Sequence, residues 1–356
     1  MIKQTSYTKE WIDSRISIKK KINPVLCEKM IRALGLLEQL VLQGLDFVFK
    51  GGTALILLID DPQRFSIDID INTEESKEYL EKILKTIQDQ GLFSGYKENE
   101  RNKTGIPKAH YKFFYNSSIN GNSEYILLDV LFHKHSYPKI IKTLVKSLWL
   151  DTDDHSLYVN TPGIESILGD KMVASAPNTT GILYGRGKSI EIIKQIFDVG
   201  RLFSLAENLA EISESFMIHT NEESKFRNLN IQPQDVLIDI IQTGMLIAQS
   251  PAKVKAHKEK FDELLEGIKR FSAYPIGVRY QQDEAIISSA KASYLATLIL
   301  SGDSTFITKY QQDTLFSEIA IPSQYNYIQK LRKRVPEAYY YWEQVFRYIA
   351  LSKIEL

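Results

Sequence analysis

The chain has almost no cysteine and no long apolar run. Its 356 residues include a single cysteine, Cys27, so an intramolecular disulfide is excluded. No amino-terminal run resembles a signal peptide, and no stretch reaches the roughly eighteen consecutive apolar residues of a membrane span. We therefore expect a protein of the reducing cytoplasm that does not bind membranes, with Cys27 in a hydrophobic core.

Net charge is also absent. The 44 basic residues balance 44 acidic ones, so the chain as a whole is not a general binder of polyanions. Basic residues do outnumber acidic ones in residues 1–30 and 96–149, where they could guide a nucleic acid or form ordinary solvated faces. A hydrophobic content of 44% at this length supports well-formed cores.

The pattern along the chain predicts an α+β fold. Residues 1–160 read as a mixed sheet with helices, with strands expected at 47–50, 67–71, 110–115 and 125–132 and helices at 8–21, 24–43, 53–59 and 74–90. Residues 161–356 read as an all-helical bundle, with helices at 164–174, 189–205, 209–217, 233–249, 252–271, 284–300 and 323–351. Asn23 is the expected N-cap of the second helix, with Pro24 at its first position.

Two aspartates lie side by side in the predicted strand 67–71. Ile67, Ile69 and Ile71 alternate with Asp68 and Asp70, so the isoleucines enter the core and both carboxylates share the other face. Because adjacent carboxylates repel, such a pair usually holds a divalent cation, and oxygen ligands favour Mg²⁺ or Mn²⁺. The alternative is the solvated face of an antiparallel sheet.

Gly51, Gly52 and Thr53 follow an apolar strand and begin a predicted helix. The backbone N–H groups of such a turn could hold a phosphate, with Thr53 as the N-cap or a first-turn hydroxyl. Most turns of this kind, however, are only turns.

A third carboxylate, Asp129, interrupts the apolar run 124–132. A carboxylate inside a strand is costly unless it is paired, binds a metal or faces solvent, so we assign it to the same site, with an exposed edge strand as the alternative. If the strand continued, His133 and His135 would share its face; if it ends before Pro138, both histidines are solvated.

These segments resemble a known family. Residues 49–55 and 64–70 resemble the signature of the AbiEii/AbiGii toxin family, a branch of the DNA polymerase β-like nucleotidyltransferase superfamily. The resemblance implies the minimal nucleotidyltransferase fold and a metal site at Asp68, Asp70 and Asp129. It also implies that a nucleoside triphosphate is bound by Lys50, Gly51, Gly52, Thr53, Arg64 and Ser66.

The resemblance continues in residues 162–174 and 187–203. It implies that Lys171 contacts the nucleotide phosphates, and that Asp198 holds this lysine or acts near the reacting hydroxyl. The chain has Lys194 and Gln195 where the family has Arg-Asp. The alternatives are a solvated helix lysine at position 171 and, for Asp198, a surface ion pair with Lys194.

The function implied is Mg²⁺-dependent transfer of a nucleoside monophosphate from a triphosphate to an acceptor hydroxyl, with tRNA as the expected acceptor. The family further implies a toxin of a toxin–antitoxin or phage-defence system, with a cognate antitoxin as partner. The alternatives are an antibiotic-modifying nucleotidyltransferase and a non-catalytic nucleotide-binding module. Interleaved basic and aromatic residues in 330–348 suit either RNA stacking or helix packing.

Overall fold

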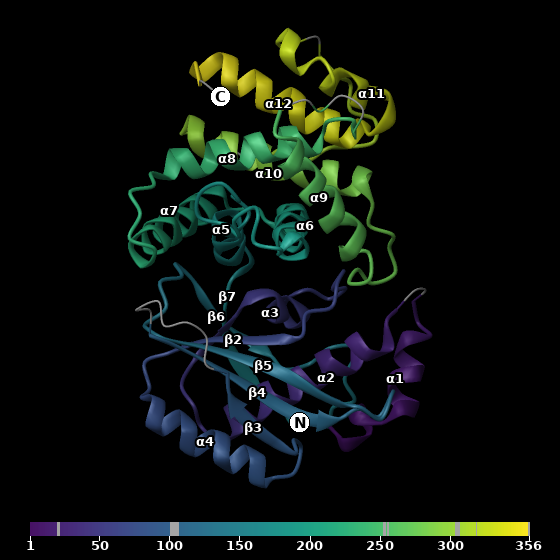
Figure 1. Ribbon diagram of the computed structural model, residues 1–356, viewed down its shortest axis with the longest axis vertical. Helices are drawn as coiled ribbons and strands as arrows, with labels where there is room; N and C mark the ends of the chain where they lie inside the picture. Colours follow the sequence, from purple (N-terminus) through teal and green to yellow (C-terminus); the bar gives the residue numbers. More distant parts are fainter. Residues whose placement is uncertain are drawn as a thin grey trace. The chain divides into compact units, whose positions relative to one another are not determined.

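The structure is a computed structural model that describes residues 1–19, 22–99, 107–251, 254, 256–302, 307–317 and 319–354. The chain forms two compact units (Figure 1): Met1–Gly163 with Ala273–Arg279, and Ile164–Ser272 with Tyr280–Leu356. The sequence pattern placed the division at residue 160. It did not indicate that the short segment Ala273–Arg279 belongs to the first unit.

The first unit is a seven-stranded mixed sheet with helices, which confirms the predicted α+β fold. Its helices are η1 (Gln4–Tyr7), α1 (Lys9–Ile16), α2 (Pro24–Leu42), α3 (Gly51–Leu58) and α4 (Lys77–Asp89). Its strands are β1 (Val48–Lys50), β2 (Asp68–Thr73), β3 (Gly95–Glu98), β4 (Lys108–Asn116), β5 (Ser123–Phe132), β6 (Ile140–Leu144) and β7 (Tyr158–Pro162).

The strand order is β3-β4-β5-β2-β1-β7-β6 (Figure 1). Strands β2 and β5 are parallel, as are β1 and β7, and the other neighbours are antiparallel. The sequence predicted β1, β2, β4 and β5 but missed β3, β6 and β7. The missed strands are short, with four or five residues each, whereas β1, with three residues, was predicted because it is apolar and leads into the glycine turn.

One face of this sheet is covered by the apolar sides of helices. Helix α2 begins as predicted, because the Asn23 side chain accepts hydrogen bonds from the backbone N–H groups of Val25 and Leu26. It contacts β2, β5 and α4, and its apolar residues join those of α4 and the sheet in one core. Cys27 lies in this core, fully buried as expected, and burial raises the pKa of its thiol to about 12.

In the second unit every regular element that the structure describes is a helix. The elements are α5 (Ile164–Ala174), α6 (Ser189–Leu205), α7 (Leu209–Phe226), α8 (Pro233–Ile247), α9 (Lys258–Phe271), α10 (Gln282–Ser301), η3 (Ser323–Tyr325), η4 (Ile328–Lys330), α11 (Leu331–Arg334) and α12 (Pro336–Ser352). Helix α10 contacts α6, α8, α9 and α12 and is the centre of this bundle.

Two helix predictions in this unit are wrong. The helix expected at 252–271 begins only at Lys258; residues 252, 253 and 255 lie outside the described part of the chain. The helix expected at 323–351 is broken into η3, η4, α11 and α12. The break falls at Val335, where φ is −140°, because the following Pro336 disfavours a helical conformation for the residue before it.

The aromatic residues of α12 pack inside the bundle. Tyr339, Tyr340, Tyr341 and Trp342 are at most 6% exposed, and the Tyr341 ring lies 5.2 Å from that of Phe203. The packing alternative is therefore correct, and these rings cannot stack on RNA bases.

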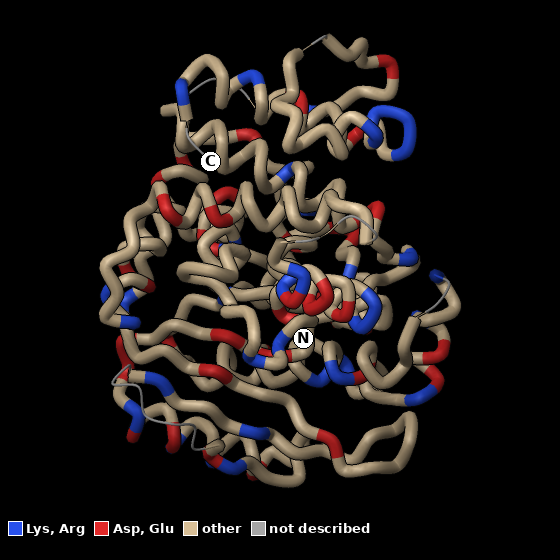
Figure 2. The backbone as a smooth tube through the Cα atoms, turned by 45° about the horizontal axis from the view of Figure 1, so that its top comes forward, with Lys and Arg blue, Asp and Glu red and all other residues tan. Residues whose placement is uncertain are grey.

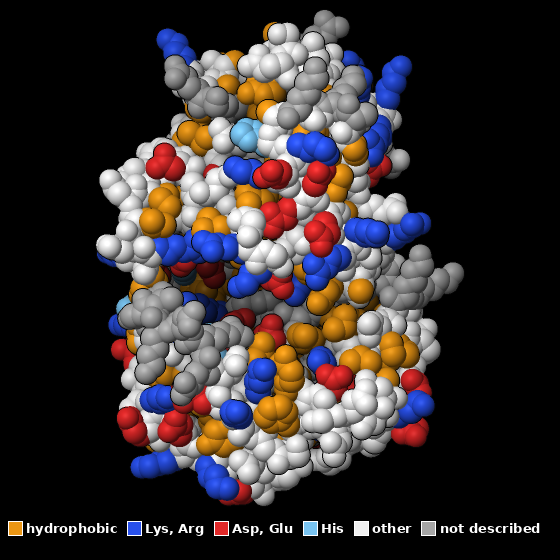
Figure 3. Space-filling model, in the orientation of Figure 1, with side chains coloured by type: hydrophobic (Ala, Val, Ile, Leu, Met, Phe, Trp, Pro, Cys, Tyr) orange, Lys and Arg blue, Asp and Glu red, His pale blue; other side chains and the backbone are white. Residues whose placement is uncertain are grey.

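Charges of both signs are mixed over each unit. Figure 2 shows basic and acidic residues interspersed along the trace, and Figure 3 shows both signs on one face. Among the described residues, no helix is both long enough and apolar enough to cross a bilayer.

Candidate active site

The two aspartates of β2 lie on the polar face of the sheet. Ile69 and Ile71 are buried, while Asp68 and Asp70 remain half-exposed on the other side of the strand. Ile67 does not join them in the core, because β2 begins at Asp68 and Ile67 is only half-buried. The predicted alternation is otherwise confirmed.

Asp129 lies beside Asp70 across the neighbouring strand. The two residues are register partners in the parallel pair of β2 and β5. Strand β5 lies between β4 and β2, so the alternative of an edge strand is wrong. Leu128 and Val130 on either side of Asp129 are buried on the opposite face. The sheet thus brings the three predicted carboxylates to one face of two adjacent strands.

His110, on β4, was missed by the sequence analysis. It is the register partner of Asp129 on the other side, and its Nδ1 lies 2.6 Å from Asp129 Oδ1. The side chains are 18% and 27% exposed, respectively. A histidine that holds a carboxylate in this way can fix its orientation. The only signal in the sequence was that His110 lies on the polar face of a predicted strand.

Asp70 is packed against the glycine turn. Gly51 has a φ of +77°, and a Cβ added there would collide with the Asp70 carboxylate. Lys50, the last residue of β1, is the register partner of Asp70. Position 51 thus requires glycine both for its backbone conformation and for the close approach of the carboxylate to the start of α3.

Arg64 and Ser66 meet the same turn at its second glycine. A Cβ on Gly52 would collide with the Arg64 guanidinium and lie 2.8 Å from the Ser66 hydroxyl. Arg64 is 8% exposed, and its Nη1 donates a hydrogen bond to the Phe65 carbonyl. The structure therefore gathers Arg64, Ser66 and Asp70 around the turn.

The segment Ala273–Arg279 pairs with the residues around Arg64 through an isolated β-bridge between Arg64 and Pro275. Phe65 N–H donates to the Tyr274 carbonyl at 3.0 Å, and Ile276 N–H donates to the Gln63 carbonyl at 2.8 Å. Because the two segments are more than 200 residues apart, no local pattern could reveal this pairing.

Thr53 has a structural contact of its own. It lies in the first turn of α3, as predicted, but the residue that precedes the helix as its N-cap is Lys50. The Thr53 side chain is fully buried, and its Oγ1 donates to the Asp68 carbonyl at 2.5 Å. The hydroxyl thus fastens α3 to β2, and a phosphate at this turn would meet the backbone N–H of Thr53 rather than its side chain.

The two histidines after β5 do not extend the carboxylate face, because the strand ends at Phe132. His133 is exposed, and its Nδ1 lies 2.6 Å from the Lys134 carbonyl. His135 is half-buried rather than solvated, and burial, aided by Lys134, lowers the pKa of its imidazole. Within the described residues, no group of three or more His, Cys, Asp or Glu side chains is arranged to hold a metal ion.

Lys171 and Asp198 form a buried ion pair in the second unit. Lys171 Nζ lies 3.1 Å from Asp198 Oδ2, and the side chains are 10% and 2% exposed. Lys171 also donates to Gln195 Oε1 at 2.9 Å, so the residue that departs from the family pattern takes part in the pair. Both surface alternatives are wrong, because α5 and α6 pack these residues inside the bundle.

A family model decides the relationship of the chain to known proteins. Residues 35–274 match the model described as "Nucleotidyl transferase AbiEii toxin, Type IV TA system". The chain belongs to the AbiEii family. Its match runs beyond the segments that carry the sequence resemblance, which lie between residues 49 and 203, and it includes the predicted site residues, His110 and Tyr274.

Two solved structures illustrate what this chain is similar to. JHP933 from Helicobacter pylori is 14% identical, with 76% of this chain and 89% of that chain covered and a TM-score of 0.41. An antigenic nucleotidyltransferase-like protein from Paracoccidioides brasiliensis is 15% identical, with 58% and 94% covered and a TM-score of 0.36. No curated protein matches the chain.

Proposed function

We propose that this AbiEii protein is a divalent-metal-dependent nucleotidyltransferase that moves a nucleoside monophosphate from a nucleoside triphosphate to an acceptor hydroxyl, with release of pyrophosphate. The observation that carries the proposal is the position of Asp70. It packs against the glycine turn at the start of α3 and lies in register with Asp129. A phosphate-binding turn and the carboxylates are thus parts of one site.

The donor set fits Mg²⁺ or Mn²⁺ by chemical type. Asp68 and Asp70 share a strand face, and Asp129 lies on the neighbouring strand, so all three are on one face of the sheet, although the described conformation does not arrange them to hold a metal ion. In the described conformation Asp129 is hydrogen-bonded to His110. A cation held by these three carboxylates would supply charge neutralisation for the triphosphate and a lower pKa for the attacking hydroxyl.

The remaining roles belong to the chain itself. The backbone N–H groups at the start of α3 point to where phosphate oxygens would lie, and the helix dipole favours negative charge there. Arg64 and Ser66, both beside Gly52, add a positive charge and a hydroxyl at the turn. His110 orients Asp129. The roles of Lys171 and Asp198 in phosphate contact and near the reacting hydroxyl stay predictions taken from the family resemblance.

Incorporation of label tests the reaction. The purified protein is incubated with Mg²⁺, total tRNA and each α-labelled nucleoside triphosphate in turn, and label on RNA is measured. We expect one triphosphate to label RNA, EDTA to abolish the signal, and Asp70→Asn to reduce the rate about 100-fold or more.

Asp89→Asn is the matched control, because Asp89 is an exposed aspartate that ends α4 and pairs with Lys85 at the surface. It should label RNA like the parent protein. Equal labelling by the Asp70→Asn variant would overturn the proposal. Label transferred to a small-molecule hydroxyl and absent from RNA would leave the reaction in place and move the acceptor to the antibiotic-type alternative.

We further propose that the transfer is the basis of a toxin activity held in check by a cognate antitoxin. Membership of a family described as type IV toxins supports this role. Induced expression should arrest growth, and Asp68→Ala should relieve the arrest. Arrest that persists in the variant would contradict the catalytic explanation.

A further inference from the structure

A pocket inside the second unit lies outside all the residues assigned so far. It has a volume of about 340 Å³, at the lower end of the about 300–1,000 Å³ typical of small-molecule sites. Three segments line it: the loop before α6, helix α8 with the start of α9, and the η3–η4 segment. The lining residues are Asn178, Tyr184, Gln242, Thr243, Met245, Leu246, Gln249, His257, Lys260, Tyr325 and Tyr327.

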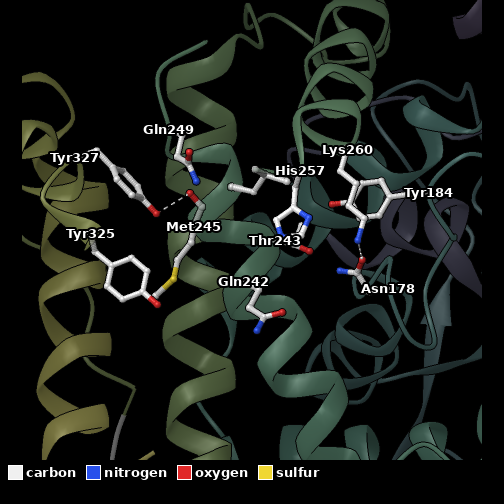
Figure 4. A pocket seen from close by; sticks show the side chains of 11 residues that line it. Asn178, Tyr184, Gln242, Thr243, Met245, Gln249, His257, Lys260, Tyr325 and Tyr327 are labelled. Atoms are coloured by element: carbon white, nitrogen blue, oxygen red, sulfur yellow. Dashed lines mark hydrogen bonds between the residues drawn. The ribbon is translucent and has the colours of Figure 1, made fainter. Parts of the chain in front are cut away.

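Aromatic rings stand on two opposite sides of this pocket. Figure 4 shows Tyr325 and Tyr327 on one side and Tyr184 on the other, with side chains of α8 between them. Tyr327 is fixed by its hydroxyl, which donates to the Met245 carbonyl at 3.1 Å. Tyr325 is supported from behind by Phe346, with ring centroids 5.5 Å apart. Rings held in this way offer flat apolar surfaces to a planar ligand.

The cationic side of the pocket is also held in place. Lys260 Nζ donates to the Asn178 amide oxygen at 2.5 Å and lies 5.4 Å from the centre of the Tyr184 ring. Because an amide oxygen is neutral, this bond directs the ammonium group without cancelling its charge. His257, just before α9, adds an imidazole on the same side of the pocket (Figure 4).

A buried carboxylate anchors the support of that lysine. Asp239, 3% exposed, accepts hydrogen bonds from the Asn178 backbone N–H at 2.7 Å, the Asn178 side chain at 2.6 Å and the hydroxyls of Thr179 and Thr243. Its lone pairs are thus directed into the protein. The network fixes Asn178 and therefore the ammonium of Lys260, which gives the pocket a preformed polar wall.

Amide groups complete the lining. Gln242 is exposed on α8, and Gln249 follows the end of this helix. Amides both donate and accept hydrogen bonds, so they suit the mixed edge of a nucleobase. Aromatic faces, amides and a directed cation are together the groups that bind a planar, hydrogen-bonding ring that carries an anion.

We propose that this pocket binds one nucleotide unit, with its base against the rings of Tyr325 and Tyr327, its edge at the glutamines and its phosphate at Lys260. The nucleotide could be free or part of a single-stranded RNA, since the chemistry is the same. Its lining residues all belong to the second unit, whereas the three carboxylates belong to the first. The proposal does not rest on the proposed function.

Calorimetric titration tests it. The full-length Asp70→Asn protein is titrated in EDTA with the four nucleoside monophosphates, and separately with single-stranded trinucleotides. Binding of both kinds indicates a site for a free nucleotide, and binding of the trinucleotides alone indicates a site for RNA. We expect Tyr325→Ala, Gln242→Ala and Lys260→Gln each to weaken binding, Tyr325→Ala by about tenfold or more.

The controls use residues outside the pocket. Lys258→Gln removes an exposed lysine of the same helix that pairs with Asp262, and Tyr158→Ala removes an exposed tyrosine of the first unit. Both should bind like the parent. Tyr327→Phe should keep the stacking face and most of the affinity. Gln242→Ala, at an exposed helix position, keeps the test valid if Tyr325→Ala unfolds. No binding of either ligand, or binding unchanged in the Gln242→Ala and Lys260→Gln variants, would overturn the proposal.

Discussion

Single residues around the glycine turn decide whether the site can form at all. Asp70 approaches Gly51 so closely that any side chain there would displace the carboxylate. His110 determines where the Asp129 carboxylate points, although it carries no predicted catalytic role. These contacts act on the same face of the sheet, one from the turn and one from β4.

Gly51→Ala should lower both stability and activity. Alanine at a φ of +77° costs about 1–2 kcal/mol of backbone strain, and its Cβ also collides with Asp70. Gly44→Ala is the matched control, because its φ is +75° and nothing lies within 4 Å of an added Cβ. Chemical denaturation and the labelling rate of both variants measure the difference. Equal activity in the two variants would show that the Asp70 contact is unimportant.

His110→Ala should reduce the labelling rate about 10- to 100-fold, the range for a residue that orients a metal ligand. Its fold should persist, because His110 lies on the polar face of the sheet and not in the core. His110→Gln, which can still donate to Asp129, should recover part of the loss. Activity unchanged in His110→Ala, with normal thermal unfolding, would remove His110 from the site.

At the scale of elements, the buried pair of Lys171 and Asp198 joins two helices. Lys171 lies on α5 and Asp198 on α6, and Gln195 on α6 takes a second hydrogen bond from the same ammonium. Such a pair adds little stability when intact, since desolvation offsets its attraction, but breaking it leaves one charge buried.

Lys171→Met should therefore lower the free energy of unfolding by about 3–5 kcal/mol, because it removes the cation that lies 3.1 Å from the buried Asp198 carboxylate. The double change with Asp198→Leu should restore much of the loss. Lys258→Met, at a surface pair on α9, should cost about 1 kcal/mol or less. Urea denaturation of the four proteins measures this, and a double variant no more stable than Lys171→Met would refute the explanation.

Across the whole molecule, buried carboxyl groups in both units make the folded protein less stable as pH rises, whereas paired carboxylates usually make a protein more stable. Glu38 in the first unit and Asp239 and Glu343 in the second are at most 4% exposed. Burial is the main cause that raises the pKa of each. A raised folded pKa means that the native state binds more protons than the unfolded state. The contribution of these groups to the free energy of unfolding therefore falls as pH rises.

Glu343→Gln removes one of these titrations and keeps an oxygen that accepts from Ser317. The stability of the parent relative to this variant should fall as pH rises above the ordinary value of 4.5, and should level off above the raised pKa. Urea unfolding between about pH 4 and about pH 8 measures the difference. Glu259→Gln, at an exposed glutamate of α9, controls for the effect of a Glu→Gln change itself. A constant difference across the range would contradict burial as the cause.

The elements with strong local patterns could be predicted from the sequence alone. The alternation around Asp68 and Asp70, the apolar run around Asp129 and the cap at Asn23 each depend on neighbours within a few residues. The same local patterns carry the AbiEii resemblance. They were enough to predict the mixed sheet and to nominate the carboxylates.

The contacts between these residues could not be predicted from local patterns and are seen in the tertiary structure. Four contacts join segments that are distant in the chain or on different elements. They are those of His110 with Asp129, Tyr274 with Phe65, Lys171 with Gln195, and Tyr325 with the rest of the pocket lining. The helical spacing in the aromatic run of α12 indicated packing as an alternative to RNA stacking, and the structure shows these rings buried. Such contacts arise from strand register and helix packing, which a local pattern does not encode.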